Sequence, residues 1–146
     1  MSKKVLLFNP RSNNHKARLP NSILQVAASI NEKYDWVIVD GNLEENPQQK
    51  IFEYLSSGSF RYFGCTVMPG PQLRQAIPIT KYVRDSYPNI KNIWGGYFAS
   101  NQYKSVIRSG LVDVVINGPG DTAFPKLLNA FENNLPIDSI NNIIYE

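Results

Sequence analysis

Two glycine turns, each placed directly after a short apolar run, constrain this chain more than any other feature of its sequence. Ile93-Trp94-Gly95-Gly96 closes one apolar run, and the sequence VVINGPGD at residues 114–121 closes the next. Glycine at the end of a strand lets the backbone adopt a positive φ and approach a ligand closely. In open parallel α/β sheets, ligands bind at the carboxyl ends of the strands. The two turns therefore predict a parallel sheet with a binding edge.

The rest of the chain follows the same alternation of elements. Short apolar runs predict strands at residues 4–9, 35–39, 62–68, 92–94 and 112–116. Stretches with a period of three to four residues predict helices at residues 19–33, 47–55, 72–86, 101–109 and 122–133. Asp121 is expected to cap the last helix, and Pro78 to kink or weaken the third. A final β-like run lies at residues 140–145.

Five successive β–α units predict an α/β fold with three layers. We expect a flavodoxin-like (Rossmann-like) five-stranded parallel sheet of order 2-1-3-4-5, with helices on both faces. The strand interiors at residues 5–8 and 114–116 are wholly apolar, as is typical of strands that are covered on both sides. In this order the binding crevice lies at the ends of the first and third strands, between the loops that follow the fourth and fifth.

Composition excludes several classes of protein. The chain of 146 residues is 42% hydrophobic and 18% charged, which is typical of one ordinary globular domain. It has no apolar run of membrane-spanning length, and its first apolar run is too short for a signal peptide, so we expect a cytoplasmic protein without membrane contact. Carboxylates interrupt the basic side chains, so nucleic acid is not an expected partner. Basic residues near the N-terminus form either an anion-binding patch or a solvated arm: Lys3, Lys4, Arg11, His15, Lys16 and Arg18.

The loops at the predicted binding edge offer hydroxyls, amides and backbone N–H groups, but no complete catalytic device. His15 is the only histidine and Cys65 the only cysteine, which excludes an internal disulfide and a cysteine-ligated cluster. Cys65 lies in an apolar run and is expected to be a buried small hydrophobe. The sequence lacks a GxGxxG motif and a P-loop. The first strand ends in Asn9 and the third in residues 66–68, so the acidic cluster of a phospho-acceptor site is missing too.

Three turns together resemble the N-terminal cobalamin-binding domain of cobalamin-dependent radical S-adenosylmethionine enzymes. Residues 67–73 (VMPGPQL) resemble the family's "TGPQ" turn, residues 93–100 (IWGGYFAS) its "WGG" turn, and residues 112–128 its "GEGE…F..LL" segment. The similarity extends over essentially the whole chain. It implies a cobalamin-binding domain at residues 1–135 and an exit strand or linker at residues 136–146, which leads toward a C-terminal radical domain.

The chain also departs from that family's pattern. The glutamates beside the fifth-strand glycine are replaced by Pro119 and Asp121, and a common histidine of the fourth-strand loop by Phe98. In the D-x-H-x-x-G motif of methionine-synthase-like cobalamin domains, Asn9 stands at the aspartate position and Arg11 at the histidine position. Ligation of cobalt by a protein imidazole is therefore not expected. The CxxxCxxC motif is absent, so the iron–sulfur cluster and S-adenosylmethionine are expected only in a missing domain.

The resemblance implies a set of cofactor-binding residues. Gly95 and Gly96 are expected to leave room for the nucleotide tail of cobalamin, and the Thr66 hydroxyl to meet its dimethylbenzimidazole. A Gly96→Val substitution is expected to fill this channel while the fold survives. The corrin ring is expected to rest on an apolar platform of Met68, Pro69, Tyr97 and Phe98, with Leu19 at its rim. The complete expected set is Asn9, Arg11, Thr66, Val67, Met68, Gly70, Gly95, Gly96, Tyr97, Gly118 and Gly120.

Three alternatives remain open from the sequence. One is a flavin mononucleotide-binding flavodoxin-like module, for which Ser12 alone makes a poor phosphate loop. Another is a small transferase that uses Arg11 and His15 on an anionic substrate. The third is a degenerate domain that has lost its cofactor and only mediates contacts, a reading favoured by Pro119 and Phe98.

Overall fold

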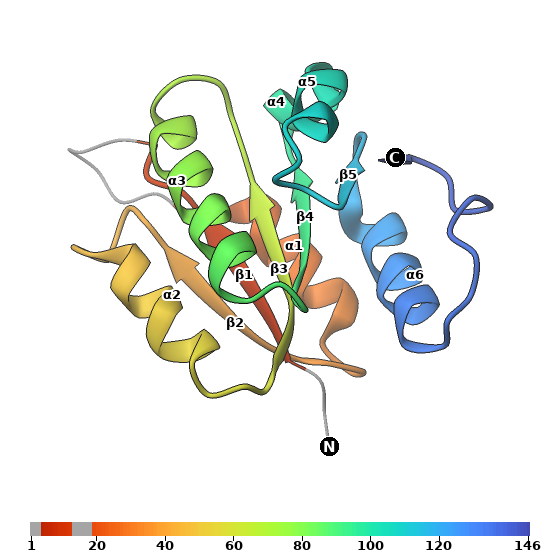
Figure 1. Cartoon of the computed structure of the whole chain (residues 1–146), viewed down its shortest axis with the longest axis horizontal. Coiled ribbons are helices and arrows are strands. Elements are labelled where there is room, and N and C mark those ends of the chain that lie inside the picture. The colour runs from red at the N-terminus through yellow and green to blue at the C-terminus, as the bar shows by residue number, and fades with distance from the viewer. Residues whose placement is uncertain (1–3, 13–18) are drawn as a thin grey trace.

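The structure is a central sheet covered by helices on both faces. A computed structural model describes residues 4–12 and 19–146 of the chain. The strands are β1 (Lys4–Asn9), β2 (Asp35–Asp40), β3 (Phe60–Thr66), β4 (Lys91–Gly95), β5 (Val114–Ile116) and β6 (Ile143–Tyr145). The helices are α1 (Asn21–Ile30), α2 (Pro47–Leu55), α3 (Pro71–Ser86), α4 (Tyr97–Asn101), α5 (Tyr103–Arg108) and α6 (Gly120–Glu132). Figure 1 shows α2 and α3 in front of the sheet and α1 behind it.

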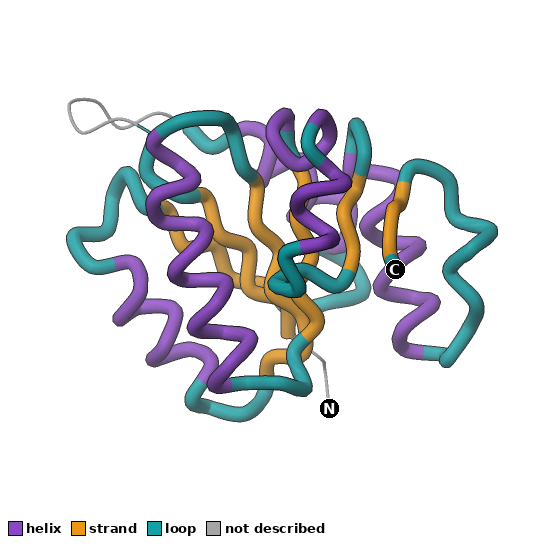
Figure 2. Tube along the Cα trace, turned by 45° about the horizontal axis from the view of Figure 1, so that its top comes forward, coloured by secondary structure: helices purple, strands orange, loops and turns teal. Residues whose placement is uncertain are grey.

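The predicted fold class and strand order are confirmed, with one addition. The sheet has six strands in the order β2-β1-β3-β4-β5-β6, and β1 to β5 are parallel. The sixth strand, which was expected to lead out of the domain, instead pairs antiparallel with β5 and places Ile144 opposite Val115. The chain reverses direction at Asn142, whose φ is 67° and whose carbonyl accepts a hydrogen bond from the Asn117 N–H at 2.7 Å. Figure 2 shows this short strand at the edge of the sheet.

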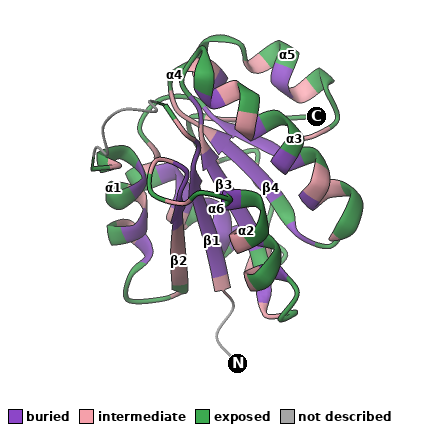
Figure 3. Ribbon diagram, turned by 90° about the vertical axis from the view of Figure 1, so that its left-hand side faces the viewer, coloured by how far each residue is buried: buried purple, intermediate pink, exposed green. Residues whose placement is uncertain are grey.

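Two apolar cores hold the layers together, one on each face of the sheet. The first lies between the sheet and α2, α3, α4 and α5, and it includes Phe8, Phe63 and Trp94. The second lies between the sheet and α1 and α6, and it includes Leu7 and Phe124. Figure 3 shows β1, β3 and β4 largely buried, β2 largely intermediate, and the outward surfaces of the helices exposed. Parallel strands with both faces covered are expected to be this apolar, because each residue of the alternating pattern meets one of the two cores.

Several local predictions need correction. Helix α1 begins at Asn21 rather than at residue 19, and the helix expected at residues 101–109 is a pair of short helices, α4 and α5. Asp121 does not cap α6, because the helix begins at Gly120, one residue before Asp121, and Pro119 occupies the N-cap position. Asp121 lies instead in the first turn, where its negative charge is favourable to the helix dipole. Pro78 lies inside α3, and the helix continues on both sides of it.

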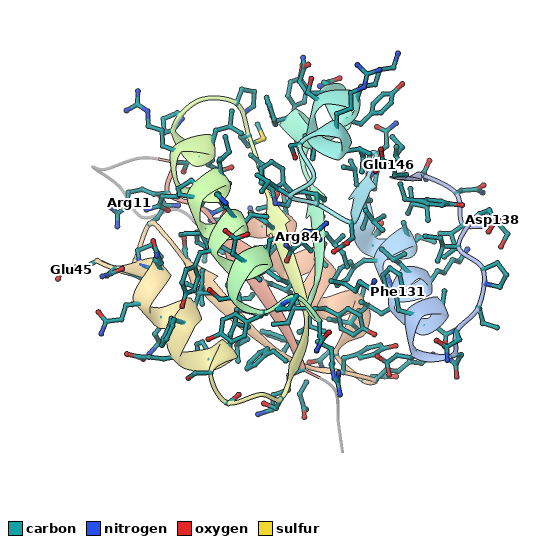
Figure 4. The ribbon with its side chains drawn as sticks, in the orientation of Figure 1. Arg11, Glu45, Arg84, Phe131, Asp138 and Glu146 are labelled. Carbon is teal, nitrogen blue, oxygen red and sulfur yellow. The ribbon has the colours of Figure 1, made fainter. Side chains whose placement is uncertain are left out.

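Part-buried polar groups at the amino end of β4 join this strand to α3 and to the residue that precedes β5. The Asp113 carboxylate accepts the Asn92 N–H at 2.7 Å and pairs with the Arg84 guanidinium at 2.9 Å. Figure 4 shows Arg84 projecting from α3 at the middle of the molecule. Among residues 4–12 and 19–146, no helix has both the length and the apolar character needed to cross a membrane.

Candidate functional site

A cavity of about 270 Å³ lies between the sheet and the two helices α1 and α6. Its base is formed by apolar side chains from the middle of the sheet and from the two helices. These residues are less than 5% exposed: Leu7 of β1, Ile23 of α1, Ile93 of β4, Ile116 of β5 and Phe124 of α6. The cavity thus extends from the carboxyl edge down into the second core.

Glycines on two neighbouring strands face this cavity. Gly64 pairs with Ile93 across β3 and β4, and Gly95 pairs with Thr66 two residues closer to the carboxyl edge. Because side chains alternate along a strand, both glycines face α1 and α6. A Cβ added at Gly95 would have no neighbour nearer than the Ile116 Cβ at 4.0 Å, so this glycine leaves the cavity open. A Cβ at Gly64 would lie 3.0 Å from the Cδ2 of Leu7 and 3.6 Å from the Phe124 ring, so Gly64 lets these side chains pack closely against β3.

A second and wider cavity of about 640 Å³ opens at the carboxyl edge of the sheet. The two cavities share Ser22, Ile23, Thr66, Gly96 and Gly118, so they adjoin each other. Polar, uncharged side chains line the wider cavity: Asn9, Ser12, Asn21, Ser22, Thr66, Gln72, Ser100 and Asn101. The described residues around it include no charged side chain. The described part of the site is therefore a broad uncharged mouth next to a narrow channel with an apolar base.

Gly96 lines both cavities, but it is a glycine for a different reason from Gly95. Its φ is 93°, and an added Cβ would lie 2.8 Å from the backbone nitrogen of Val67 and 2.9 Å from the Thr66 Oγ1. Those backbone atoms are held in place, since the Val67 N–H donates to the Gly95 carbonyl and the Val67 carbonyl accepts the Phe98 N–H. The expectation that Gly96→Val leaves the fold intact is therefore wrong. The turn itself requires this glycine.

Hydrogen bonds fix the loops around the mouth. The Gln72 side chain donates to the Asn9 Oδ1 at 3.2 Å and to the Pro10 carbonyl at 2.8 Å, and it accepts the Met68 N–H at 2.7 Å. Asn9 donates in turn to the Asp40 carboxylate at 3.2 Å. The loops that follow β1 and β3 are thereby joined through the first turn of α3. The amide groups of Asn9 and Gln72 are occupied by these bonds, so we assign them to holding the mouth open.

Ser100 ties the other side of the mouth. Its hydroxyl accepts the Gly118 N–H at 3.0 Å and lies 3.4 Å from the Ile116 carbonyl, to which it donates. These bonds join α4 to the loop that follows β5. The binding edge is therefore built before any ligand arrives, as is common for small-molecule sites.

Arg11 lies outside both cavities. Its guanidinium donates to the Gly41 carbonyl at 2.7 Å and to the Glu44 carbonyl at 2.6 Å, and its backbone N–H donates to the Gln75 Oε1. Figure 4 shows Arg11 beside the segment that carries Glu45, at one margin of the molecule. Its role in this structure is to fasten the loop after β1 to the loop after β2.

The structure brings together most, but not all, of the residues expected from the sequence. Those that line a cavity are Asn9, Thr66, Met68, Gly95, Gly96, Tyr97, Gly118 and Gly120. Val67 is fully buried in the first core, and Gly70 precedes α3 without lining either cavity. His15 lies outside the described residues.

The expected apolar platform is present in part. Leu19, Met68 and Tyr97 are 78%, 48% and 62% exposed, and all three line the mouth. Phe98 does not belong to it, because its side chain packs against the first core. The mouth thus combines exposed apolar side chains with the polar side chains named above.

Sequence reasoning missed the contribution of β3 and α1 to the channel. Gly64 was overlooked, although a glycine inside an apolar strand is itself a signal of close approach. The α1 residues that line the channel are Ser22, Ile23, Gln25 and Val26. No local pattern marks them, because the packing of α1 against α6 decides which side of α1 meets the channel.

The only cysteine is buried, as expected. Burial raises the pKa of the Cys65 thiol well above its ordinary value, and its side chain packs in the first core rather than in the channel. Over residues 4–12 and 19–146, His, Cys, Asp and Glu side chains form no group of three or more that is able to hold a metal ion. The described residues of the site can therefore bind and orient a ligand, and the one carboxylate among those that line the cavities is that of Asp121.

Comparison with known proteins identifies the fold. No family model and no curated protein matches the sequence. The chain superposes on the radical S-adenosylmethionine methyltransferase TsrM from Kitasatospora setae, solved with cobalamin and a [4Fe-4S] cluster bound, with a TM-score of 0.85 and 19% identity. It superposes on the cobalamin-dependent S-adenosylmethionine radical enzyme OxsB, solved with aqua-cobalamin bound, with a TM-score of 0.84 and 17% identity.

These matches cover 99% of this chain but only 29% of TsrM and 21% of OxsB. The structural neighbours thus belong to the same class of enzymes as the family that the sequence resembles. The isolated REC domain of RcsB from Salmonella enterica serovar Typhimurium also shares the fold, with a TM-score of 0.61, 15% identity and coverage of 92% of this chain and 91% of that chain. One fold therefore serves different functions, and the site has to decide between them.

Proposed function

We propose that this chain is a cobalamin-binding domain of a cobalamin-dependent radical S-adenosylmethionine enzyme. The observation that carries the proposal is the pair of adjoining cavities at the carboxyl edge, a broad mouth with an uncharged described lining and a narrow channel with an apolar base. Cobalamin has a matching form, with a broad corrin ring and a nucleotide tail that ends in a bicyclic base. The likeness to TsrM and OxsB, both solved with cobalamin bound, supports the same ligand.

The corrin ring would lie over the mouth. Its rim carries amide side chains, which both donate and accept hydrogen bonds, and the wall of the mouth offers uncharged hydroxyls and amides. Leu19, Met68 and Tyr97 supply exposed apolar surface for the face of the ring. The nucleotide tail would enter the channel past Gly95, with the Thr66 hydroxyl at the junction of the two cavities.

We propose that no protein side chain ligates the cobalt. Arg11, which stands at the histidine position of methionine-synthase-like domains, is fastened to the carbonyls of Gly41 and Glu44. His15 lies outside the described residues, and we expect His15→Ala to leave the absorption spectrum of the bound cofactor unchanged. An imidazole-ligated spectrum that disappears in this variant would contradict the proposal.

The activity of the parent enzyme is part of the proposal. The chain spans less than a third of the length of TsrM or OxsB, so the iron–sulfur cluster and S-adenosylmethionine would belong to a C-terminal radical domain. Residues 1–135 would form the cobalamin-binding domain and residues 136–146 the exit segment. Bound cobalamin supplies methyl-transfer or redox chemistry for alkylation or rearrangement of an unreactive carbon. A cytoplasmic location remains a prediction.

The flavin alternative is less well supported by the cavities. A flavin mononucleotide carries a phosphate, and the described residues around the two cavities include no lysine or arginine. Asp121 adds a negative charge at the channel, which disfavours an anion there. The neutral mouth favours a ligand that is rich in amides.

The test is a titration of the chain with hydroxocobalamin, followed by visible absorbance. We expect saturable binding by the unaltered chain and its loss in Gly95→Leu, because the leucine would occupy the channel where an added Cβ meets only open space. Lys91→Leu is the matched control: Lys91 lies on the same strand and the same side of the sheet, but outside both cavities. Absence of binding by the unaltered chain would refute the proposal and favour the degenerate interaction domain. Binding of flavin mononucleotide instead would favour the flavodoxin-like module.

A further inference from the structure

The polar and apolar parts of the channel wall are separated by depth. The side chains at its base come from Leu7, Ile23, Ile93, Ile116 and Phe124, all of them buried and without a polar atom. The strand backbone beneath them is paired within the parallel sheet. The base of the channel therefore offers a ligand contact surface but no hydrogen-bond partner.

The polar side chains that line the channel are exposed or half-buried, unlike the apolar side chains of its base. Ser22 and Gln25 are exposed on α1, Asp121 is exposed on α6, and Thr66 is half-buried where the two cavities meet. Cys65 contributes to the wall of the channel, but its thiol packs in the core on the opposite face of the sheet. A group that passes Thr66 and enters the channel therefore leaves its polar partners behind.

We propose that this channel selects cobamides with an apolar benzimidazole as lower base over those with a purine such as adenine. The inference rests on the proposed function, and it adds which members of the cobamide class the site accepts. Benzimidazole and purine share a bicyclic outline, so the volume of the channel does not separate them. They differ on the six-membered ring, where adenine carries two ring nitrogens and an amino group in place of carbon-bound hydrogens.

The selectivity follows from desolvation. A polar group that leaves water for an apolar site without a new hydrogen-bond partner weakens binding, whereas an apolar ring gains from burial. Hydrophobic sites discriminate modestly against a polar isostere, by up to about 100-fold. We expect the adenine-based cobamide to bind about 10- to 100-fold more weakly than cobalamin.

The test titrates the 146-residue chain with four corrinoids and follows visible absorbance. They are cobalamin, the cobamide with unmethylated benzimidazole, the adenine-based cobamide, and cobinamide, which lacks the nucleotide tail. The proposal predicts that both benzimidazole forms bind more tightly than the adenine form and than cobinamide. Equal affinity for the adenine form overturns it, as does equal affinity for cobinamide, because the base would then lie outside the channel. Binding of the unmethylated benzimidazole form as weak as that of the adenine form also overturns the proposal, because contacts of the methyl groups rather than the polarity of the base would then determine the affinity.

A pair of substitutions on α1 tests whether the channel wall causes the selectivity for the lower base. Val26 is half-buried in the channel wall, and its Cγ2 lies 3.3 Å from the position of a Cβ added at Gly120. Val26→Asn adds a hydrogen-bonding group there and is expected to narrow the ratio of cobalamin to adenine-form affinity at least threefold. Leu24→Asn, which alters an exposed residue of the same helix outside the channel, is expected to leave the ratio unchanged. An unchanged ratio in a folded Val26→Asn protein overturns the proposal.

The outcomes separate this inference from the proposed function. If cobalamin itself does not bind, the proposed function fails and the selectivity fails with it. If cobalamin binds and the lower base makes no difference, only the selectivity is overturned.

Discussion

The two adjacent glycines at the end of β4 are predicted to respond in opposite ways to the same substitution. In Gly96→Ala, the new methyl group would lie within 3.0 Å of the Val67 backbone and the Thr66 Oγ1, and the residue would be held at a φ of 93°. In Gly95→Ala, the methyl group would enter the open channel, with its nearest neighbour at 4.0 Å.

The magnitude follows from these two geometries. The Gly96 backbone, with a φ of 93° and a ψ of 177°, lies in a region confined essentially to glycine, which costs another residue about 1–3 kcal/mol. Forcing a methyl group into a filled site costs about 1–3 kcal/mol more. Gly96→Ala should therefore lower the free energy of unfolding by about 2–6 kcal/mol. Gly95→Ala should change it by less than about 1 kcal/mol, because the lower entropy of the unfolded chain offsets small losses.

Urea denaturation followed by far-UV circular dichroism measures both effects. With a urea dependence of about 2 kcal/mol per molar, the midpoint of Gly96→Ala should fall by about 1–3 M while that of Gly95→Ala stays close to the parent value. A Gly96→Ala protein as stable as the parent would refute the assignment of Gly96 to the turn. A Gly95→Ala protein destabilised as strongly as Gly96→Ala would refute the open channel.

Three further predictions concern Arg11, Asp113 and Cys65. Arg11→Ala should lower the free energy of unfolding by about 1–2 kcal/mol in urea melts, because it removes the hydrogen bonds to the loop after β2. The absorption spectrum of bound cobalamin should stay unchanged. A changed spectrum would indicate that Arg11 contacts the ligand. Asp113→Ala should cost about 1–3 kcal/mol in the same assay, because the buried Asn92 N–H loses its acceptor, and a neutral result would contradict this assignment. The raised pKa of Cys65 keeps its thiol protonated in the folded state. Its contribution to stability is therefore complete below about pH 8.5 and is lost as the pH rises above the pKa of the unfolded thiol. In urea melts between about pH 7 and pH 10, the free energy of unfolding should fall more steeply with pH in the parent than in Cys65→Ala.

The local pattern of the chain carried enough information for the order of the elements. Apolar runs such as residues 5–8 and 114–116 bury one side chain after another on alternating faces, which only a strand covered on both sides permits. Right-handed crossovers then leave few possible strand orders, and the order 2-1-3-4-5 was among them. The pairing of residues 143–145 with β5 was not predicted, because it depends on tertiary contacts and on a turn at Asn142, whose φ is 67°.

The candidate site was predictable in its position and less so in its details. Glycines after strands marked the carboxyl edge, and eight of the eleven expected residues line the cavities there. The direction in which the long Arg11 side chain points was not predictable from the sequence. Arg11 was expected at the cofactor because of its place in the loop, but carbonyls that come from residues 41 and 44 hold it elsewhere.

The sequence by itself determined where the backbone turns and which runs are buried, because positive φ and apolar periodicity are properties of neighbouring residues. Only the tertiary structure decided what each glycine does. Gly95 opens the channel, Gly64 lets Leu7 and Phe124 pack closely against β3, and Gly96 serves the turn because an added Cβ would lie within 3.0 Å of the Val67 backbone. That distinction depends on which atoms from distant parts of the chain surround each missing side chain, and these distances exist only once the layers have packed.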